Sequence, residues 1–177
     1  ADEFDAIVLR ANSNDAWNFW GGANVQYLRD QWGRSTQLAM GQPSSHGNFV
    51  HLYIDGQYWG LYNPSERPNQ SFAATYFGGE KDNWDAINSG SAVNGDLNAW
   101  NTMISLATAV NTATVATSDA AYQQLQGNNA DGSASATREN YLDVENLIDY
   151  MIVNLYGGNS DWPHKNYWVG RERGPDS

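Results

Sequence analysis

The sequence predicts an α+β fold in which an antiparallel sheet with a central β-hairpin packs against several helices. Residues 49–62 alternate between apolar and polar positions around a turn dipeptide, which indicates a hairpin. Residues 97–110 and 147–155 instead repeat apolar residues at helical spacing. The 177 residues suffice for one domain with its own core and are few for two.

The hairpin is the clearest local element. Alternate apolar residues share one face of its first strand: Val50, Leu52 and Ile54. Asp55-Gly56 follows, a dipeptide that tolerates the positive φ angles of a type I′ turn. We expect this hairpin to be a central part of the sheet, with Trp59 or Leu61 on its return strand mostly buried.

The elements that flank the hairpin are expected as follows. Residues 4–10 are rich in Ile, Val and Leu and predict a short buried strand. Residues 26–32 form a possible helix. Asp96 is a suitable N-cap for a helix that runs to residue 110. A shorter helix is expected over residues 119–125, followed by an exposed Gly/Ser-rich loop over residues 127–136.

The strongest helical signal comes near the C-terminal end. Asp143 is its predicted N-cap, and Gly157-Gly158 end it. Its apolar stripe consists of Leu147, Ile148, Met151, Ile152 and Leu155. A loop is expected over residues 159–163, and a strand begins near residues 167–169.

Composition excludes several function classes. Lys and Arg total 9 against 20 Asp and Glu, a net charge of −11, so we expect no nucleic-acid partner. No apolar run approaches the ~20 residues of a membrane helix, so we expect no membrane insertion. The absence of cysteine excludes disulfides and thiol chemistry. Abundant aromatic residues among Gly, Asn, Ser and Asp suit a loop-rich extracellular domain, so we favour a secreted or cell-surface bacterial protein.

One loop carries residues suited to chemistry. Asp161 and Asn166 stand five positions apart between the C-terminal helix and the following strand. Protein kinases use this spacing in their catalytic loop, where the Asp orients the acceptor hydroxyl and the Asn holds a magnesium ion. Asp and Asn are also common turn formers, and Lys165 is equally explained as a solvated charge, so the spacing alone leaves both interpretations open.

Other clusters are better explained by structure. Residues 82–85 and 94–96 offer side-chain oxygens that suit calcium, but neither segment has EF-hand spacing and both lie where helix caps are expected. His46, His51 and His164 are too far apart in the sequence to predict a metal site. No phosphate-binding glycine loop of the Gly-x-x-x-x-Gly-Lys type is present.

Three segments, in order, resemble the CotH family, which is named for a spore-coat protein. Residues 8–15 are similar to its early strand and turn, Leu-Arg-Asn followed by Asp. Residues 50–66, which read VHLYIDGQYWGLYNPSE, resemble its central hairpin. Residues 147–167 resemble its helix and Asn-x-Asp-Trp loop. The resemblance covers roughly residues 4–172.

The resemblance implies an atypical, protein-kinase-like fold and ATP-dependent phosphorylation of Ser or Thr on secreted or surface proteins. It implies Asp161 as the catalytic-loop base, Asn166 as a metal ligand, and Mg²⁺ or Mn²⁺ with ATP as cofactors. Glu66 would be the acidic partner of a nucleotide-contacting lysine, although beside Arg67 it also suits a surface ion pair. Lys165 or Lys81 would contact phosphate in place of the family's usual lysine, although neither lies on the strand where the family places that residue.

We expect residues 1–177 to form a single CotH-like domain that is incomplete at both ends. The family's basic strand would precede residue 1, and its second metal-binding aspartate would follow residue 177. We therefore expect the chain alone to be inactive, or nearly so, as a kinase.

The alternative is a non-catalytic extracellular module that binds carbohydrate or plays a structural role at a surface. Exposed Trp and Tyr among Asn and Asp would suit sugar stacking. The two functions predict different geometry: a cleft that contains Asp161, Asn166 and Glu66, or a flat aromatic face.

Overall fold

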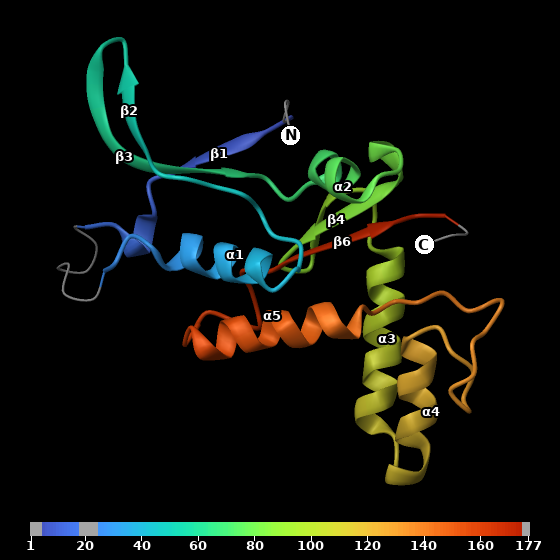
Figure 1. Cartoon of the computed structure of the whole chain (residues 1–177). Coiled ribbons are helices and arrows are strands. Elements are labelled where there is room, and N and C mark those ends of the chain that lie inside the picture. Colours follow the sequence, from blue (N-terminus) through green and yellow to red (C-terminus); the bar gives the residue numbers. More distant parts are fainter. Residues whose placement is uncertain (1–4, 18–24, 175–177) are drawn as a thin grey trace.

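The described part of the chain folds into six strands and five α-helices, which confirms the predicted α+β class (Figure 1). The computed structural model describes residues 5–17 and 25–174. The strands are β1 (Ile7–Arg10), β2 (Val50–Ile54), β3 (Gln57–Glu66), β4 (Trp84–Asn88), β5 (Ser91–Asn94) and β6 (Trp168–Glu172). The helices are α1 (Arg29–Ala39), α2 (Gln70–Phe77), α3 (Asn98–Thr112), α4 (Val115–Leu125) and α5 (Val144–Tyr156), with 3-10 turns η1 (Ser13–Asp15) and η3 (Lys81–Asn83).

The first sheet contains the predicted hairpin and has the antiparallel order β1-β3-β2. Asp55 and Gly56 both have positive φ, 49° and 79°, as the predicted turn requires. The pairing runs from Val50 opposite Tyr62 to Ile54 opposite Gln57, with a β-bulge after Leu52. β3 is therefore the central strand of this sheet, while β2 forms an edge.

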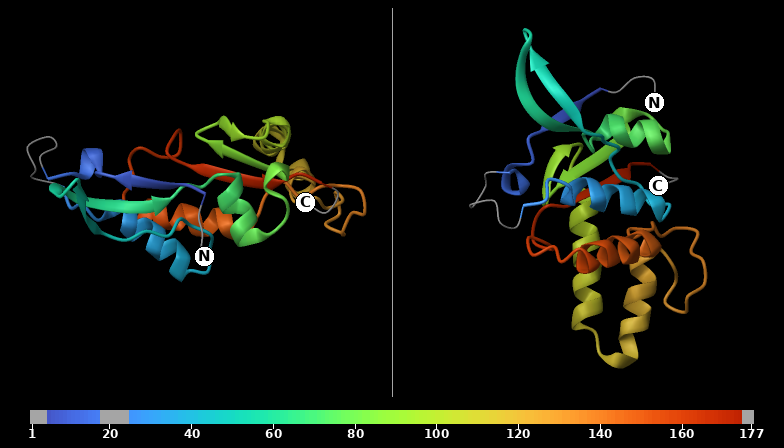
Figure 2. Two further views of the ribbon diagram at one scale, coloured as in Figure 1. Left: turned by 90° about the horizontal axis from the view of Figure 1, so that it is seen from above. Right: turned by 60° about the vertical axis from the view of Figure 1, so that its left-hand side comes forward.

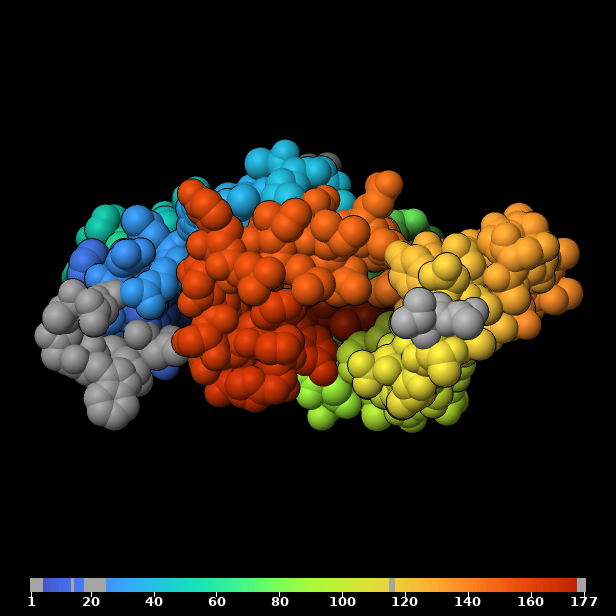
Figure 3. All heavy atoms as spheres, turned by 90° about the horizontal axis from the view of Figure 1, so that it is seen from below, coloured from blue at the N-terminus to red at the C-terminus, as the bar shows by residue number. Residues whose placement is uncertain are grey.

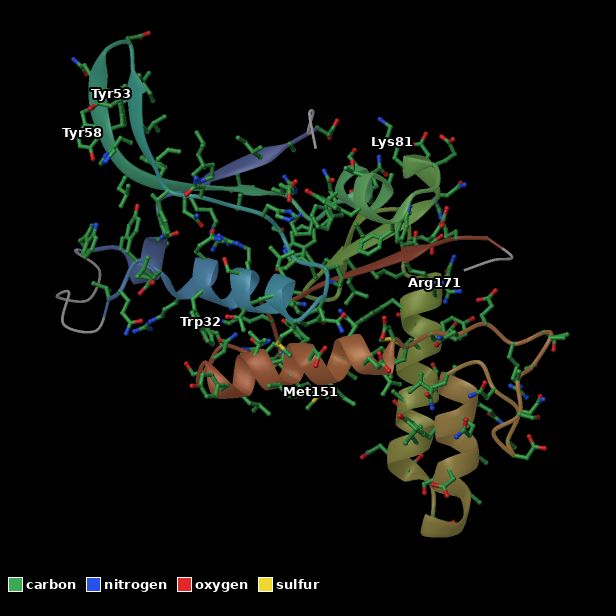
Figure 4. The ribbon with its side chains drawn as sticks, in the orientation of Figure 1. Trp32, Tyr53, Tyr58, Lys81, Met151 and Arg171 are labelled. Carbon is green, nitrogen blue, oxygen red and sulfur yellow. The ribbon has the colours of Figure 1, made fainter. Side chains whose placement is uncertain are left out.

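The expected burial of the hairpin is only partly right. Trp59 is 57% exposed, and Val50 and Ile54 are also exposed, whereas Leu61 is half-buried. β3 is twice as long as β2, and only its C-terminal half lies beside β1, where Asn63 is fully buried. The turn end of the hairpin projects away from the other elements, and Tyr53 and Tyr58 lie side by side on it (Figure 4).

The second sheet contributes buried residues to the core, and the sequence pattern does not predict most of it. Its antiparallel order is β5-β4-β6, so β4 lies in the middle. The first four residues of β4 are buried: Trp84, Asp85, Ala86 and Ile87. On one face, Asp85 lies opposite Arg171 and Ile87 lies opposite Val169. The predicted strand start near residue 167 is confirmed as β6.

The helices differ from expectation mainly in length. α1 begins three residues later than expected and extends to Ala39, and α4 begins four residues earlier than Asp119. α2 was not predicted. α3 and α4 pack against each other as a hairpin that extends from the rest of the chain (Figure 2). Within the described residues, none of the helices is long and apolar enough to span a membrane.

α5 lies beside α1 and presents its polar side to the rest of the protein. The side-chain amide of Gln42 binds Asp149 at 2.7 Å and accepts a hydrogen bond from Asn146 at 2.9 Å. Val153 is the buried residue of the helix. The predicted apolar stripe therefore faces outward, with Ile152 51% exposed and Leu155 67% exposed. Met151 lies on this outer side, away from Trp32 of α1 (Figure 4).

Candidate functional site

Helix α5, which leads into the loop between α5 and β6, begins and ends at features that the sequence predicts. The Asp143 carboxylate accepts a hydrogen bond from the Asn146 amide at 2.9 Å, which confirms it as the N-cap of α5. At the other end, Gly158 has a φ of 64°, a conformation that favours glycine and ends the helix. The Gly157 position lies close against the Trp32 ring of α1, so α1 fixes where the loop begins.

Asp161 lies on this loop with its carboxylate half exposed. Its backbone amide donates to the Asn159 side chain at 3.1 Å, and the Asn159 amide in turn donates to Asn154 of α5 at 2.7 Å. Lys165 lies one helical turn further, with its ammonium 3.5 Å from the Asp161 carboxylate. Both side chains are 49% exposed, so solvent screens this ion pair and it contributes little to stability.

Asn166 is anchored through its backbone. Its φ is 63°, which asparagine tolerates better than most residues. Its amide donates to the Ser89 hydroxyl at 3.0 Å, and its carbonyl accepts from the Tyr150 hydroxyl at 3.5 Å. These hydrogen bonds tie the loop to the β4–β5 turn and to α5. Its exposed side chain keeps the amide oxygen available to a ligand.

Glu66 belongs to a second cluster at the end of β3. Its carboxylate accepts from the Tyr76 hydroxyl at 2.5 Å and from the His46 backbone amide at 2.9 Å, and the His46 ring nitrogen Nδ1 lies at 2.9 Å. The His46 and Tyr76 rings stack with centroids 5.2 Å apart. Glu66 is thus held by β3, α2 and the segment before β2.

The hydrogen bonds around Glu66 change its acidity and that of its neighbour. Burial raises the pKa of the Glu66 carboxyl, but the hydrogen bonds from Tyr76 and His46 together outweigh it, so that pKa is lowered. Burial and the hydrogen bond to Glu66 raise the pKa of Tyr76 to about 12. Both shifts favour an ionised Glu66 that accepts from a neutral Tyr76.

The predicted site residues therefore fall into two groups. Asp161, Lys165 and Asn166 share one loop, whereas Glu66 lies at the end of β3. Within the described residues, no hydrogen bond or ion pair joins the two groups. The small cavity beside Glu66 has a volume of about 20 Å³, room for one water molecule, so it is far too small for a nucleotide.

Sequence reasoning missed two partners of Glu66. The three histidines are scattered in the sequence, so they predict no shared site that would include His46. Tyr76 lies on α2, a helix that the sequence pattern does not predict. Neither position carries a local pattern, because the cluster forms only when β3 and α2 fold back on each other. The helical spacing of the aromatic residues Phe72 and Tyr76, four positions apart, is the signal in this segment that indicates structure.

The acidic segments 82–85 and 94–96 form an ion-pair network. Asp85 is 2% exposed, accepts from the Asp96 amide at 2.9 Å, and lies 3.4 Å from the Arg173 guanidinium. The cation of this cluster is thus an arginine rather than calcium. Across residues 5–17 and 25–174, no three His, Cys, Asp or Glu side chains gather in a way that would hold a metal ion.

Comparison with known proteins agrees with the three resembling segments. The chain matches the family model described as CotH kinase protein over residues 1–176. No curated protein matches the chain, and no solved structure does, so the kinase-like fold stays a prediction. Because the match spans essentially the whole chain, the protein belongs to the CotH kinase family.

Proposed function

We propose that this protein transfers the γ-phosphoryl group of ATP to Ser or Thr hydroxyls of secreted or surface proteins. One observation carries the proposal: in a CotH kinase family chain, Asp161 and Asn166 lie five positions apart on a loop between a helix and a strand. Kinase catalytic loops place their base and their metal-binding amide in this arrangement.

Asp161 is the proposed base. Its carboxylate is half exposed, while its backbone is fixed through Asn159 to α5. An acceptor hydroxyl can therefore approach the exposed carboxylate of a residue whose backbone is held in place before the substrate binds. Lys165 is the proposed cation of this loop. Its ammonium lies beside Asp161 and would face the negative charge that develops on the transferred phosphoryl group.

Asn166 supplies the oxygen ligand for the metal. Mg²⁺ and Mn²⁺ prefer oxygen ligands, and Mg²⁺ takes many of them from phosphates and water. The residues present fit such a metal, because Asn166 is anchored by its backbone and offers its side-chain oxygen, with the Asp161 carboxylate on the same loop. The bound ion would shield the negative charge of the phosphates.

Glu66 is the proposed acidic partner of a cation on the nucleotide side. Its lowered pKa keeps it ionised at neutral pH, and Tyr76 and His46 fix both carboxylate oxygens. The adjacent cavity has room for one water molecule, which an ammonium group of similar size would replace.

The test measures phosphate incorporation from radiolabelled ATP with Mg²⁺, using the full-length gene product and a mixture of surface proteins as acceptors. Asp161→Asn should reduce incorporation by at least about a hundredfold, because it removes the general base. Asp131→Asn, on an exposed loop, is the matched control and should leave the rate unchanged. Undiminished transfer by Asp161→Asn, with an unchanged melting temperature, would remove this loop from the mechanism.

The alternative, a carbohydrate-binding module, is favoured by one surface. Tyr53, Tyr58 and Trp59 are 55–62% exposed near the hairpin turn, and aromatic rings of this kind stack on sugars. Titration with neutral oligosaccharides, monitored by tryptophan fluorescence, separates the two functions. Saturable binding that Trp59→Ala abolishes would favour the module.

A further inference from the structure

A cavity of about 240 Å³ lies between the second sheet, α3 and the segment that precedes α5. The cross-strand pairs Asp85–Arg171 and Ile87–Val169 line its floor. Trp100 and the neighbouring residues of α3 form one wall, and residues 140–143 form the other. In Figure 3 the hollow is seen from below, with β6 in dark red between the orange 140–143 region and α3.

The lining combines apolar side chains with charged ones. Ile87, Trp100 and Met103 supply apolar surface, together with Ala99, Leu142 and Val169. Arg171 lies 4.4 Å over the Tyr141 ring and 2.8 Å from the Glu139 carboxylate. Tyr141 also donates to Glu139 at 2.8 Å, so these three residues fix one side of the cavity before any ligand arrives.

The volume limits what the cavity binds. Sites for drug-sized ligands typically enclose ~300–1,000 Å³. The cavity, at about 240 Å³, is smaller than this and does not accommodate a nucleoside triphosphate with its metal. It is large enough for one bulky apolar side chain. An aromatic wall at Trp100 and a flexible neighbour at Met103 suit such an occupant, because methionine adapts to irregular shapes.

Charge favours a basic segment around that side chain. Arg171 is paired with Glu139, and Asp85 is paired with Arg173, so these charges largely cancel. Asp143 adds an exposed carboxylate at the rim, and the chain as a whole carries a net charge of −11. A peptide with Lys or Arg beside the apolar residue would be attracted to this rim.

The cavity also adjoins the proposed catalytic loop. Trp100 stacks on Tyr167 with centroids 5.9 Å apart, and Tyr167 directly follows Asn166. The same loop is tied to the β4–β5 turn, because Ser89 accepts from Asn166 at 3.0 Å and donates its amide to the Tyr167 carbonyl at 3.0 Å. A side chain held in the cavity would therefore lie near Tyr167, the residue next to the proposed metal ligand Asn166.

We propose that this cavity binds one bulky apolar side chain of the protein substrate, next to Lys or Arg and close in sequence to the phosphorylated residue. The inference rests on the proposed function and adds to it a substrate preference. Figure 4 shows Arg171, one of the residues that line this cavity, on β6 beside the upper end of α3.

The experiment measures binding of fluorescent peptides in the absence of ATP. The probes are short Arg-containing peptides with one Ser, in which Phe is placed at each position in turn, and an all-Ala series is the comparison. At the preferred position, Phe should raise affinity about tenfold or more, because burying a large apolar side chain has this effect. Equal affinities for the Phe and Ala series would overturn the inference.

A cavity-filling variant tests the location. Ala99→Phe should erase the preference for Phe by occupying the space, and Met103→Ala should weaken it. Ala109→Phe is the matched control, because Ala109 lies exposed on the same helix outside the cavity, and the preference should persist. A preference for Phe that survives Ala99→Phe in a folded protein would overturn the inference. Displacement of the Phe-containing peptide by adenosine would also overturn it.

Because ATP is absent, the outcome does not depend on catalysis. A Phe preference lost in Ala99→Phe supports the cavity even when no variant transfers phosphate, in which case only the proposed function fails. Active transfer without such a preference keeps the proposed function and refutes the cavity.

Discussion

The Tyr76–Glu66 hydrogen bond offers a quantitative test of the second cluster. Tyr76→Phe removes the hydroxyl that lies 2.5 Å from Glu66. The Tyr76 pKa of about 12, against its usual 10.0, is a shift of roughly two units, or about 2.7 kcal/mol at 1.36 kcal/mol per unit. Because Tyr76 is 39% exposed, solvent screening reduces this, and we expect a loss of about 1 kcal/mol.

Urea unfolding measures this loss, and the melting temperature should fall by roughly 2–4 °C. Tyr122→Phe, exposed on α4, is the matched control and should have little effect. The stability lost in Tyr76→Phe should depend on pH both in alkaline and in acidic solution. The pKa of Tyr76 is raised by folding, so its contribution is complete below pH 10.0 and disappears as the pH rises toward about 12.

Acid should remove the same contribution from the other side. The pKa of Glu66 is lowered by folding, so its contribution is complete above the usual value of 4.5 and is lost as the pH falls through the lowered pKa. The difference in the free energy of unfolding between Tyr76→Phe and the parent protein should therefore become smaller in acid. A destabilisation that stays constant from acid to neutral pH would refute the hydrogen bond as its source.

Three further predictions concern Lys165, the N-cap of α5 and the turn before α3. Lys165→Ala should lower phosphate transfer about tenfold in steady-state assays, while Lys81→Ala should not. Asp143→Ala should cost about 1 kcal/mol in urea unfolding through loss of the α5 cap, and an unchanged midpoint would refute the cap. Gly95→Ala should cost on the order of 3 kcal/mol or more, because its Cβ would overlap the Asp85 carboxylate. Gly132→Ala, also at positive φ but with only ordinary contacts to the Gln123 side chain, should cost about 1 kcal/mol.

Local chemistry made several elements predictable. Asp55-Gly56 specifies its turn through backbone conformations that few other dipeptides accept, and Asp143 specifies a helix start because its carboxylate accepts a hydrogen bond from the Asn146 backbone amide. Both act within a few residues, so neither depends on the rest of the fold. The loop with Asp161 and Asn166 was predictable for the same reason, since a glycine-ended helix and a strand bracket it.

Burial was less predictable because it depends on contacts between distant elements. Trp59 alternates as a core residue would, yet β1 pairs only with the far end of β3 and leaves the hairpin turn without a neighbour. β4 was missed because Asp85 interrupts its apolar pattern. That carboxylate is buried only because the Arg173 side chain and the Asp96 amide reach it from other elements.

The Glu66 cluster shows the same limit for functional residues. His46, Glu66 and Tyr76 lie on three elements, so no spacing in the sequence relates them. The family resemblance drew attention to Glu66 through a motif, whereas its partners became visible only in three dimensions.

Paramagnetic broadening by Mn²⁺-ATP tests the central claim most directly. The measurement follows backbone amide resonances of the chain as Mn²⁺-ATP is added, and it detects even weak, short-lived binding near the metal. We predict that resonances of residues 159–167 broaden first, and that Asn166→Ala abolishes the effect while Asn129→Ala, in the exposed loop after α4, preserves it. Broadening centred elsewhere, or unchanged in Asn166→Ala, would contradict the assignment of this loop as the phosphoryl-transfer site.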